Sequence, residues 1–563
     1  MPSIITRAQD PAAYNTLIAG DVDPRMARLY AARGVRAARE LDYTITALLP
    51  PTLLSHIVQA ALFLADAIAA KKKMLIVADY DADGATACVV GMRALTAMGA
   101  VVDFIVPDRF KFGYGLTPEI VALAAERAPD ILITVDNGIA SVDGVAEANR
   151  RGIAVLVTDH HLPGQSLPDA ACIVNPNQPF DTFTSKNLAG VGVIFYVMLA
   201  LRGELRKRGA FSARKEPNLG ELLDLVALGT VADVVRLDHN NRVLVEQGLS
   251  RIRAGHMCAG IRALLTVGGR EGHIAQASTY DLGFVVGPRL NAAGRLDDMS
   301  LGINCLLADD EQTATALAHK LDTLNKERRV IETDMRESAA ADLTAVDVEG
   351  RYALALFDPT WHQGVVGILA SRIREKTHRP VIAFAADGAG NLKGSGRSIK
   401  ALHMRDALDL ITKRHPDLIT RFGGHAMAAG LTIPQSALTD FAKAFEIVAR
   451  QLLSPGDLNE RIETDGALNA EELTFDFAVQ IEEQVWGQGF AAPTFTGKFR
   501  VIDQRIVGGK HMKLKLSMGG AHFEAMRFGS AESLNPSIDA VFRPSINVFR
   551  GAASLQLMLD HVA

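Results

Sequence analysis

Cysteine is scarce in this chain. Only four cysteines occur among 563 residues, and they are Cys88, Cys172, Cys258 and Cys305. They lie far apart and form no CxxC pair, which argues against a cysteine-ligated zinc site. So few scattered thiols suit a reducing compartment such as the cytoplasm.

Long apolar segments are also missing. The longest uncharged apolar run, residues 188–201, is too short to cross a bilayer, and it predicts a buried helix instead. The first residues, MPSIITRAQDPAAYN, show no basic stretch followed by an apolar core, so we expect no secretory signal. We therefore expect a cytoplasmic protein that does not enter a membrane.

An excess of positive charge is absent as well. The formal net charge is −5, so binding to nucleic acid would depend on local basic surfaces. Two segments supply such a surplus. Residues 351–430 hold twelve Lys or Arg against six Asp or Glu, and residues 491–563 hold nine against five.

Strands and helices alternate from about residue 73. The expected strands are apolar runs at residues 74–78, 101–107, 130–136 and 153–159, with helical periods between them. Thr117 followed by Pro118 is a typical start of one such helix. Unbroken apolar strands that alternate with helices predict a parallel sheet covered on both faces.

The length and the later patterns predict several domains. A long polar-faced helix is expected at 310–338 and a second α/β pattern at 351–452. After Pro455-Gly456, alternating strands suggest a small β-barrel in the size range of an OB-fold. We predict an α/β protein with two α/β lobes, a connecting helix and an OB-like barrel. The expected boundaries are an N-terminal segment at 1–45, a first lobe at 46–308, the helix at 309–345, a second lobe at 346–454 and the barrel at 455–563.

Metal-ligand residues gather at four points, which we place at strand ends. These are DYDADG (79–84), VDNG (135–138), TDHH (158–161) and TVADVV (230–235). A turn or helix cap explains any single aspartate among them equally well. The adjacent pair His160-His161 favours a metal site over a structural cap, because packing rarely needs two histidines in one short turn. Open α/β sheets bind their ligands at the carboxyl ends of the strands.

Clustered carboxylates and imidazoles favour divalent cations. The oxygen-rich balance favours Mn²⁺ or Mg²⁺ over Zn²⁺. Cations would also relieve the repulsion between the carboxylates. Two such ions can hold both the attacking and the leaving oxygen of a phosphoryl group, so hydrolysis of a phosphorus–oxygen bond is the chemistry that this cluster suits.

These motifs resemble a known family. DYDADG, DNG, DHH and the isolated Asp233 are similar to the four motifs of the DHH phosphoesterase superfamily, and FGGHAMAAGLTI (422–433) resembles its companion DHHA1 domain. GPRLNAAGRLDDM (287–299), WHQGVVGILASR (361–372) and KGSGRS (393–398) resemble segments of the single-strand-specific exonucleases in that superfamily. The match covers about residues 40–450 and lacks no motif residue. The resemblance makes the first lobe a DHH catalytic domain and the second a DHHA1 domain.

The resemblance implies roles for individual residues. Two Mn²⁺ or Mg²⁺ ions would be held by Asp81, Asp83, Asp136, His160 and Asp233, with Asp136 as the bridge. His161 would contact the scissile phosphate or protonate the leaving oxygen, and Asp159 would orient the histidines. Asp79 stays open between a further metal ligand and a turn cap.

Substrate contacts are expected from all three domains. In FGGHAMAAG the residues alone favour a tight turn before a small-residue helix, whereas the resemblance implies that Gly423, Gly424 and His425 contact a nucleotide. Ser395 and Arg397 suit either phosphate binding or a surface hairpin. The further candidates are Arg109, Arg289, Asn291, Arg295, His362, Ser371 and Arg372, and for each arginine an ordinary ion pair is a rival explanation.

The barrel carries its own candidates. Lys513 and Lys515 alternate along one expected strand, with Phe495, Phe499, Phe523 and Phe528 nearby. They suit neutralisation of a single-stranded backbone and base stacking. Lysines that protect an edge strand and phenylalanines that fill the core explain the pattern equally well.

The predicted function is a single-stranded-DNA-specific 5′→3′ exonuclease that uses two metals, releases mononucleotides and acts in DNA repair and recombination. The resemblance alone supplies the polarity, and it implies a helicase and a single-strand-binding protein as partners. We expect the strand to pass between the two α/β lobes. One alternative is a DHH/DHHA1 phosphodiesterase for short oligonucleotides or cyclic dinucleotides, and a weaker one is a non-catalytic replication scaffold.

Overall fold

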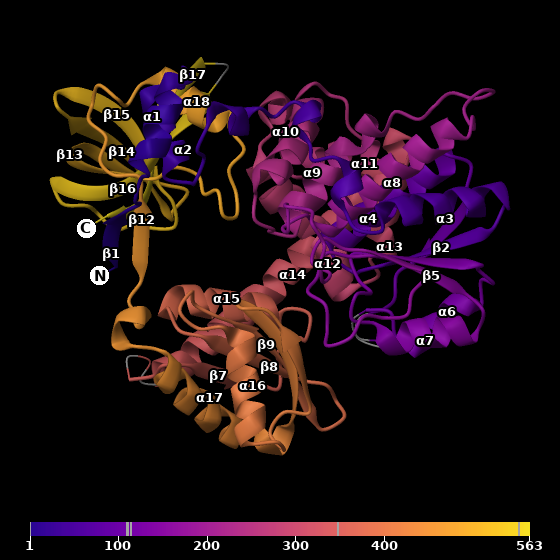
Figure 1. Ribbon diagram of the computed structural model, residues 1–563. Coiled ribbons are helices and arrows are strands. Elements are labelled where there is room, and N and C mark those ends of the chain that lie inside the picture. The colour runs from indigo at the N-terminus through magenta and orange to yellow at the C-terminus, as the bar shows by residue number, and fades with distance from the viewer. Residues whose placement is uncertain are drawn as a thin grey trace. The chain divides into compact units, whose positions relative to one another are not determined.

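The computed structural model describes residues 2–108, 112, 115–345, 348, 350–549 and 552–562 (Figure 1). Its internal contacts divide the chain into two compact units. The smaller unit contains Met1–Ile5 and Thr323–Ile462, and the larger unit contains Thr6–Asp322 and Glu463–Ala563. The larger unit therefore joins the first lobe to the C-terminal barrel.

A parallel sheet forms the centre of the first lobe. Its strands are β2 (Lys73–Ala78), β3 (Val101–Ile105), β4 (Ile131–Val135), β5 (Ala154–Thr158) and β6 (Cys172–Val174). They lie in the order β3-β2-β4-β5-β6, and every neighbouring pair is parallel. The predicted sheet is confirmed. Only β6 was missed, because a strand of three residues is too short to show a pattern.

Helices cover both faces of this sheet (Figure 1). α6 (Pro118–Ala125) and α7 (Val142–Arg150) pack on one face, where Ile120 and Val145 join the apolar cluster of the strands. α4 (Ala82–Ala97) contacts β2 and β3, and it packs against α8 (Gly190–Lys207), which also contacts α3 (Ile57–Ala69). Thr117 caps α6 as predicted, since its hydroxyl accepts the N–H of Ile120. α8 is the predicted buried helix.

The rest of the first lobe is helical. It contains η1 (Ala38–Leu41), η2 (Ile45–Ala47), η3 (Pro51–Leu53), η4 (Leu219–Leu222), α9 (Leu223–Ala232), α10 (His239–Arg253), α11 (Ala259–Val267), η5 (Glu271–Gln276), the π-helix η6 (Asp281–Val286), α12 (Gly287–Leu296) and α13 (Ser300–Leu307). α9 packs against both α10 and α4. Within the described residues no single helix is long and apolar enough to cross a membrane. One helix pair, Ile45–Leu53 with Ile57–Ala69, is bent by 84° and meets the criteria for a membrane span by length and composition alone.

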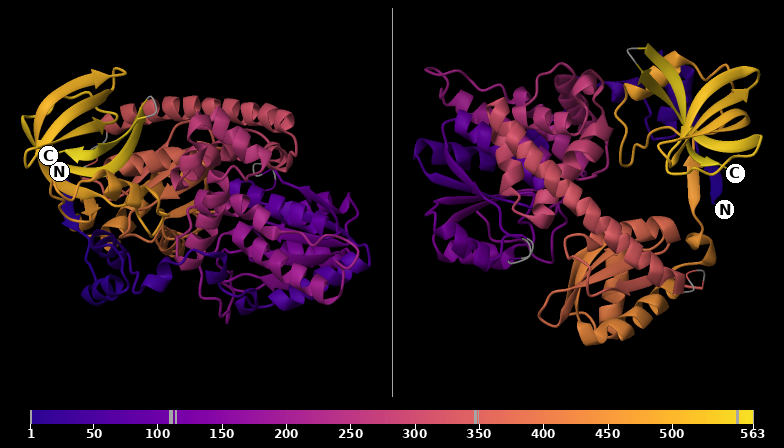
Figure 2. Two further views of the ribbon diagram at one scale, coloured as in Figure 1. Left: turned by 90° about the horizontal axis from the view of Figure 1, so that it is seen from above. Right: turned by 180° about the vertical axis from the view of Figure 1, so that it is seen from behind.

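A single long helix, α14 (Glu311–Ala345), corresponds to the predicted connecting helix (Figure 2). The boundary between the two units falls within it, after Asp322. Its first part belongs to the larger unit, where Asp322 pairs with Arg289. Its later part belongs to the smaller unit, where Glu332 pairs with Arg328 and Arg372. Polar contacts therefore anchor both parts of this polar-faced helix.

The smaller unit is built on a mixed sheet. Its elements are β7 (Leu354–Phe357), α15 (Val366–Thr377), β8 (Val381–Ala386), β9 (Asn391–Arg397), α16 (Met404–Arg414), β10 (Arg421–Gly424), β11 (Ala428–Pro434), η7 (Gln435–Ala437), α17 (Leu438–Leu452) and η8 (Pro455–Leu458). The strand order is β10-β11-β9-β8-β7, and only β7 and β8 are parallel.

The glycine-rich segment at 422–433 corrects one expectation from the sequence. It forms the hairpin of β10 and β11, with Gly424 paired to Ala429, and not a turn followed by a helix. The overlooked signal was an alternation of period two, because Ala429, Leu431 and Ile433 are buried while their neighbours are not. The run of small residues had favoured a helix.

The C-terminal domain is a closed β-barrel. Its strands are β13 (Phe495–Val507), β14 (His511–Met518), β15 (Ala521–Arg527), β16 (Ser537–Phe549) and β17 (Ala552–Val562), in the order β13-β14-β15-β17-β16. The predicted barrel is confirmed. Phe495, Phe499 and Phe523 are buried in its core, so for these three the core-filling alternative holds and base stacking does not. Phe528 alone of the four is exposed.

The N-terminal segment packs beside the barrel, although the sequence suggested no partner for it. β1 (Ser3–Thr6) pairs with β12 (Arg461–Thr464), and the segment continues through α1 (Pro11–Ala19) and α2 (Pro24–Ala31). The hydroxyl of Tyr30 donates to Gln484, which follows α18 (Phe475–Glu482). Arg33 forms an ion pair with Asp465 at 2.8 Å, and both side chains are almost fully buried.

Asp465→Ala is expected to lower the free energy of unfolding by about 3 kcal/mol, because the substitution leaves a buried guanidinium without its carboxylate. Lys498→Ala is the matched control. It breaks the exposed Lys498–Asp539 pair and should cost at most about 0.5 kcal/mol. Urea unfolding of the full chain, followed by circular dichroism, measures both. Equal losses in the two variants would contradict a structural role for the buried pair.

Candidate metal centre

The four predicted ligand segments converge at one edge of the parallel sheet. Asp79 follows β2, Asp136 follows β4, and the Asp159-His160-His161 turn follows β5. The prediction that Asp233 lies at the end of a strand is wrong. Asp233 directly follows the last residue of helix α9 (Leu223–Ala232). The apolar run before it, Leu223–Ala232, forms helix α9 and not a strand.

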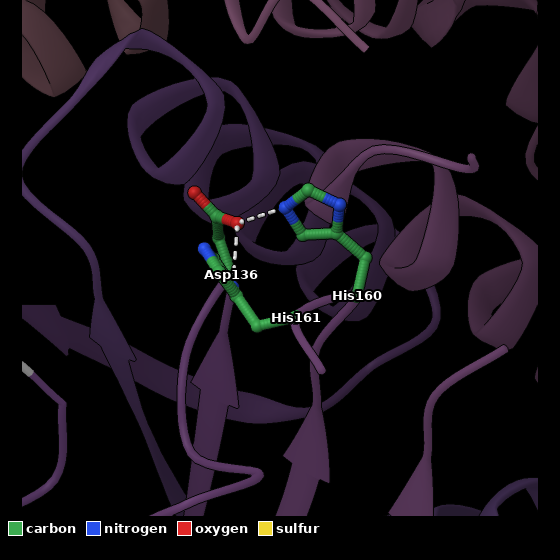
Figure 3. A group of neighbouring side chains, drawn as sticks. All are labelled: Asp136, His160 and His161. Carbon is green, nitrogen blue, oxygen red and sulfur yellow. Dashed lines mark ion pairs between the residues drawn. The ribbon is translucent and has the colours of Figure 1, made fainter. Parts of the chain in front are cut away.

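Three overlapping groups of side chains offer ligand atoms within 4.8 Å of one another. They are Asp136 with His160 and His161, Asp83 with His160 and Asp233, and Asp79 with Asp81 and Asp136. His160 Nε2 lies 3.0 Å from an Asp136 oxygen and 3.5 Å from an Asp233 oxygen. Figure 3 shows both histidines directed at Asp136. Asp136 and His160 each belong to two groups, as ligands shared within one cluster would.

Asp81 and Asp83 are held by the ends of two helices. Asp81 Oδ1 caps α4 by accepting the N–H groups of Asp83 at 2.9 Å and Gly84 at 3.0 Å. The carboxylate of Asp83 accepts the N–H groups of Gly190 at 2.6 Å and Val191 at 2.9 Å, at the start of α8. The helix-cap and metal-ligand explanations of Asp81 are therefore compatible, because one of its two oxygens does the capping.

The buried carboxylates repel one another. Burial is the largest cause that raises the pKa of Asp83 to about 7, and the nearby charge of Asp81 adds to it. Burial and then the charge of Asp83 raise the pKa values of Asp136 and Asp233 well above the ordinary value. Cations that neutralise this cluster would favour the ionised forms. Carboxylate oxygens with imidazole nitrogens form a donor set that fits Mn²⁺ or Mg²⁺.

Asp159 fixes the histidine turn. Its Oδ1 accepts the N–H groups of His160 at 2.7 Å and His161 at 3.1 Å, and it lies 2.8 Å from His161 Nδ1. Its other oxygen accepts the N–H of Ile139. Burial lowers the pKa of His161, but the hydrogen bond and charge of Asp159 outweigh burial and raise it to about 9. Without bound metal, this raised pKa favours the protonated form of His161 at neutral pH.

Two asparagines, absent from the predicted site, support the same turn. Asn177 Nδ2 donates to the carbonyl of His160 at 2.6 Å, and Asn175 Nδ2 donates to that of His161 at 3.0 Å. Both follow β6, the strand that was missed. The VNPN sequence after an apolar run was the available signal.

Helix α12 holds the acidic loop from behind. Asn291 Oδ1 accepts the N–H of Ala82 at 2.8 Å, so this predicted substrate residue contacts the metal loop in the structure. A Cβ at Gly294 would lie 1.8 Å from the carbonyl oxygen of Tyr80. The close approach of α12 to the loop therefore requires glycine at this position.

Gly294→Ala is expected to weaken Mn²⁺ binding by roughly 10- to 100-fold, because the added methyl group pushes α12 away from the loop that carries Asp79, Asp81 and Asp83. Gly203→Ala is the control. Gly203 lies in α8 with nothing within 4 Å of a Cβ, so alanine there should leave metal affinity unchanged. Isothermal titration calorimetry with Mn²⁺ measures both. An unchanged affinity in Gly294→Ala would contradict the supporting role of α12.

The remaining predicted substrate residues are dispersed. In the larger unit, Arg289 is buried and pairs with Asp322 at 2.8 Å. The ordinary ion pair that was the alternative to a substrate contact is therefore present. Arg295 lies in the last turn of α12 and is half-buried. Arg109 lies outside the described residues. In the barrel, Lys513 pairs with Glu524 at 3.0 Å, and Lys515 is exposed.

In the smaller unit, Arg397 is the most distinctive candidate. Its Nη1 donates to Ser395 Oγ at 3.1 Å, and a Cβ at Gly367 in the first turn of α15 would lie 3.0 Å from its Nη2. Arg372 pairs with Glu332 and Glu375. Of the other candidates, His362 precedes α15 and Ser371 lies within it. The β10–β11 hairpin contains Gly423, Gly424 and His425. His425 is exposed there.

Comparisons with known proteins agree with this architecture. The DHH family N-terminal domain matches residues 73–230, the DHHA1 domain matches 349–451 and the RecJ OB domain matches 464–561. The chain is 48% identical over 574 residues to the single-stranded-DNA-specific exonuclease RecJ of Dickeya dadantii, covering 100% of this chain and 99% of that one. It is 47% identical to the RecJ of Escherichia coli, covering 96% of each.

Solved structures show the same likeness. The crystal structure of RecJ in complex with Mn²⁺ from Thermus thermophilus matches with a TM-score of 0.83 and 30% identity, covering 100% of this chain and 79% of that one. A structure of RecJ in complex with Mg²⁺ from the same organism matches with a TM-score of 0.77 and 28% identity, covering 100% and 78%. The likeness therefore extends over the first lobe, the mixed-sheet lobe and the barrel.

Proposed function

The chain belongs to the RecJ family of single-stranded-DNA-specific exonucleases, and we propose that it degrades DNA from the 5′ end and releases mononucleotides. It is a metal-dependent nuclease that uses Mn²⁺ or Mg²⁺. The convergence of Asp79, Asp83, Asp136, His160 and Asp233 in overlapping ligand groups supports the metal-dependent hydrolysis.

The geometry of the cluster supports the roles that the family resemblance implies. Asp81, Asp83, Asp136, His160 and Asp233 would hold two divalent ions, with Asp136 shared and Asp79 as a further ligand. Bound divalent ions would stabilise the negative charge that develops on the phosphoryl group. The Nδ1 atom of His161 lies 2.8 Å from Asp159 and 3.9 Å from Asp136. Oriented in this way, His161 would contact the scissile phosphate or protonate the leaving oxygen.

We propose that the smaller unit captures the 5′ end. Arg397 supports this proposal, because among the described residues it contacts Ser395 and a backbone carbonyl but has no carboxylate partner. Its guanidinium lies against the first turn of α15, where helix N–H groups also favour anions. Ser371, His362 and the Gly423-Gly424-His425 hairpin are proposed as further contacts. Arg109, Arg289, Arg295, Arg372, Lys513 and Lys515 stay weaker candidates.

The cellular setting is also proposed. Action in DNA repair and recombination would require another enzyme, such as a helicase, to supply single strands, and a single-strand-binding protein as a partner. We place the protein in the cytoplasm, where the bacterial chromosome is available. Four free cysteines suit this reducing compartment.

Digestion of end-labelled strands tests the proposed polarity. Single strands and duplexes labelled at the 5′ or the 3′ end are incubated with Mn²⁺ or Mg²⁺, and the products are resolved by length. We expect early release of the 5′ label as a mononucleotide, and much slower digestion of blunt duplexes. Early release of the 3′ label would overturn the polarity, and equal rates on duplex and single strand would overturn the strand specificity.

A further inference from the structure

A wide cavity opens in the helical part of the first lobe. Its volume is about 960 Å³, which lies in the size range of small-molecule sites. The walls are the end of α4, the segment 215–222, the start of α9, the end of α10, the start of α11 and the residues after α13. In the larger unit, α9 packs on α4 and α10, and α13 packs on α4 and α11 (Figure 1). We call this hollow the helical cavity.

The helical cavity is distinct from the metal centre, although two helices connect them. α4 carries Asp83 in its first turn and reaches the cavity at Arg93. α9 runs from Asp224 in the cavity wall to its end beside Asp233. At about 1.5 Å per residue, each wall residue lies roughly 13 to 15 Å along its helix from the carboxylate at the metal centre. The three ligand groups contribute no residue to the described walls.

Two arginines present hydrogen-bond donors to the helical cavity. The Nε atoms of Arg93 and Arg251 are buried, and among the described residues neither has an acceptor within hydrogen-bond distance. The terminal nitrogens of Arg93 donate to the carbonyl oxygens of Leu306 and Leu307 and pair with Asp309. A buried charged donor without an acceptor is costly, so the two Nε groups favour an anionic ligand. Guanidinium groups match the geometry of phosphate oxygens.

The buried carboxylate of Asp224 lies close to both arginines. Burial raises its pKa, whereas hydrogen bonds from Cys258 and Leu225 and then the charges of Arg251 and Arg93 lower it. One oxygen accepts the N–H of Leu225 at 2.8 Å, and the other accepts that of Cys258 at 2.7 Å. Asp224 thus fixes the start of α11 against α9 and leaves the Nε groups of both arginines available to a ligand.

The remaining polar side chains suit a ligand that carries hydroxyl or amino groups. Glu216 and Glu221 line the cavity with carboxylates, and Lys215 and His256 line it with nitrogen atoms. Glu216 also pairs with two arginines of α8, which balance its charge. A bare phosphate would fill only a small part of a cavity of about 960 Å³. The cavity therefore favours a phosphate joined to a larger polar body.

We propose that the helical cavity binds a nucleoside monophosphate. Its phosphate lies between Arg93 and Arg251, and its sugar and base lie toward Glu216 and Glu221. Carboxylates accept hydrogen bonds from sugar hydroxyl groups and from the amino groups of bases, which a simple anion lacks. The supply of such nucleotides by strand degradation rests on the proposed function, whereas their binding to the cavity does not.

Calorimetric titration of the full chain tests the site. A chelator is present, so that no probe binds through a divalent ion. The probes are dAMP, deoxyadenosine, ribose 5-phosphate and inorganic phosphate. We expect dAMP to bind with a Kd below about 1 mM, and each of the others at least roughly 10-fold more weakly, because each lacks a group that the cavity recognises. Equal affinity for any of these three, or no binding of dAMP, would overturn the proposal.

Arg251→Gln places the bound phosphate. Loss of this guanidinium should weaken dAMP binding by roughly 10- to 100-fold. Arg150→Gln is the matched control, because it removes an exposed guanidinium from α7 and should leave dAMP binding unchanged. Undiminished binding in Arg251→Gln would overturn the proposal. None of these measurements depends on exonuclease activity, which the digestion of labelled strands tests separately.

Hydrogen exchange locates the nucleotide without any substitution. The unaltered protein is compared with and without saturating dAMP, again with a chelator. We expect slower exchange of backbone amides in residues 215–225 and 251–260, which form two walls of the helical cavity. Protection confined to residues 79–84 and 158–161 would place the nucleotide at the metal centre and overturn the proposal, as would the absence of any protection.

Discussion

Asp136→Asn is expected to reduce the rate of single-strand hydrolysis by at least about 1,000-fold, while the protein folds normally and still binds DNA. Asp136 belongs to two ligand groups, and a loss of about 4 kcal/mol of charge stabilisation corresponds to this factor. The backbone of Asp136 has φ 62°, a conformation that asparagine adopts readily. The substitution therefore removes the charge with little backbone strain.

Thermal unfolding of the same variant distinguishes a metal-binding role of Asp136 from a purely structural one. Removing one charge from the repelling cluster should raise the midpoint of thermal unfolding of the metal-free protein or leave it unchanged. The rise in midpoint that Mn²⁺ causes should be largely lost. Asp143→Asn, which neutralises an exposed carboxylate on α7, is the control and should behave like the unaltered protein. Undiminished hydrolysis by Asp136→Asn would show that the proposed metal assignment is wrong.

Without metal, the protein is expected to lose stability as the pH rises from about 5 to 8. The pKa of Asp83 is raised to about 7, and those of Asp136 and Asp233 are also raised. A carboxyl group whose folded pKa is raised binds its proton more tightly in the folded state, so its stabilising contribution is complete below pH 3.8 and is lost as the pH rises through the folded pKa. The midpoint of thermal unfolding should fall by roughly 5 °C or more across this range.

Mn²⁺ is expected to reverse this trend. The cation binds the ionised carboxylates, so its affinity and the stabilisation that it causes should grow with pH. Thermal unfolding at pH 5, 6, 7 and 8, with Mn²⁺ and with a chelator, measures the difference. His161 acts in the same direction, because its pKa is raised from 6.5 to about 9 and its stabilising contribution is lost as the pH rises between these values. A metal-free midpoint that rises steadily between pH 5 and 8 would contradict the predicted repulsion.

Local patterns were sufficient to predict most of the first lobe and the cluster of candidate metal ligands. Apolar strands followed by Asp79, Asp136 and Asp159 predicted a parallel sheet with ligands at its carboxyl edge, because parallel strands end at the same side. The barrel and the long helix were likewise evident from period-two and helical patterns. These features depend on residues close together in the sequence, whose spacing limits the backbone to few conformations.

Contacts between distant segments set the remaining features, and no local pattern carries them. Asn291 and Gly294 support a loop some two hundred residues earlier in the chain, and Arg33 pairs with Asp465 in the C-terminal part. The pairing of Arg289 with Asp322, which the sequence left open, is of the same kind. Only packing decides which distant segments meet, so these contacts became visible only in the folded chain.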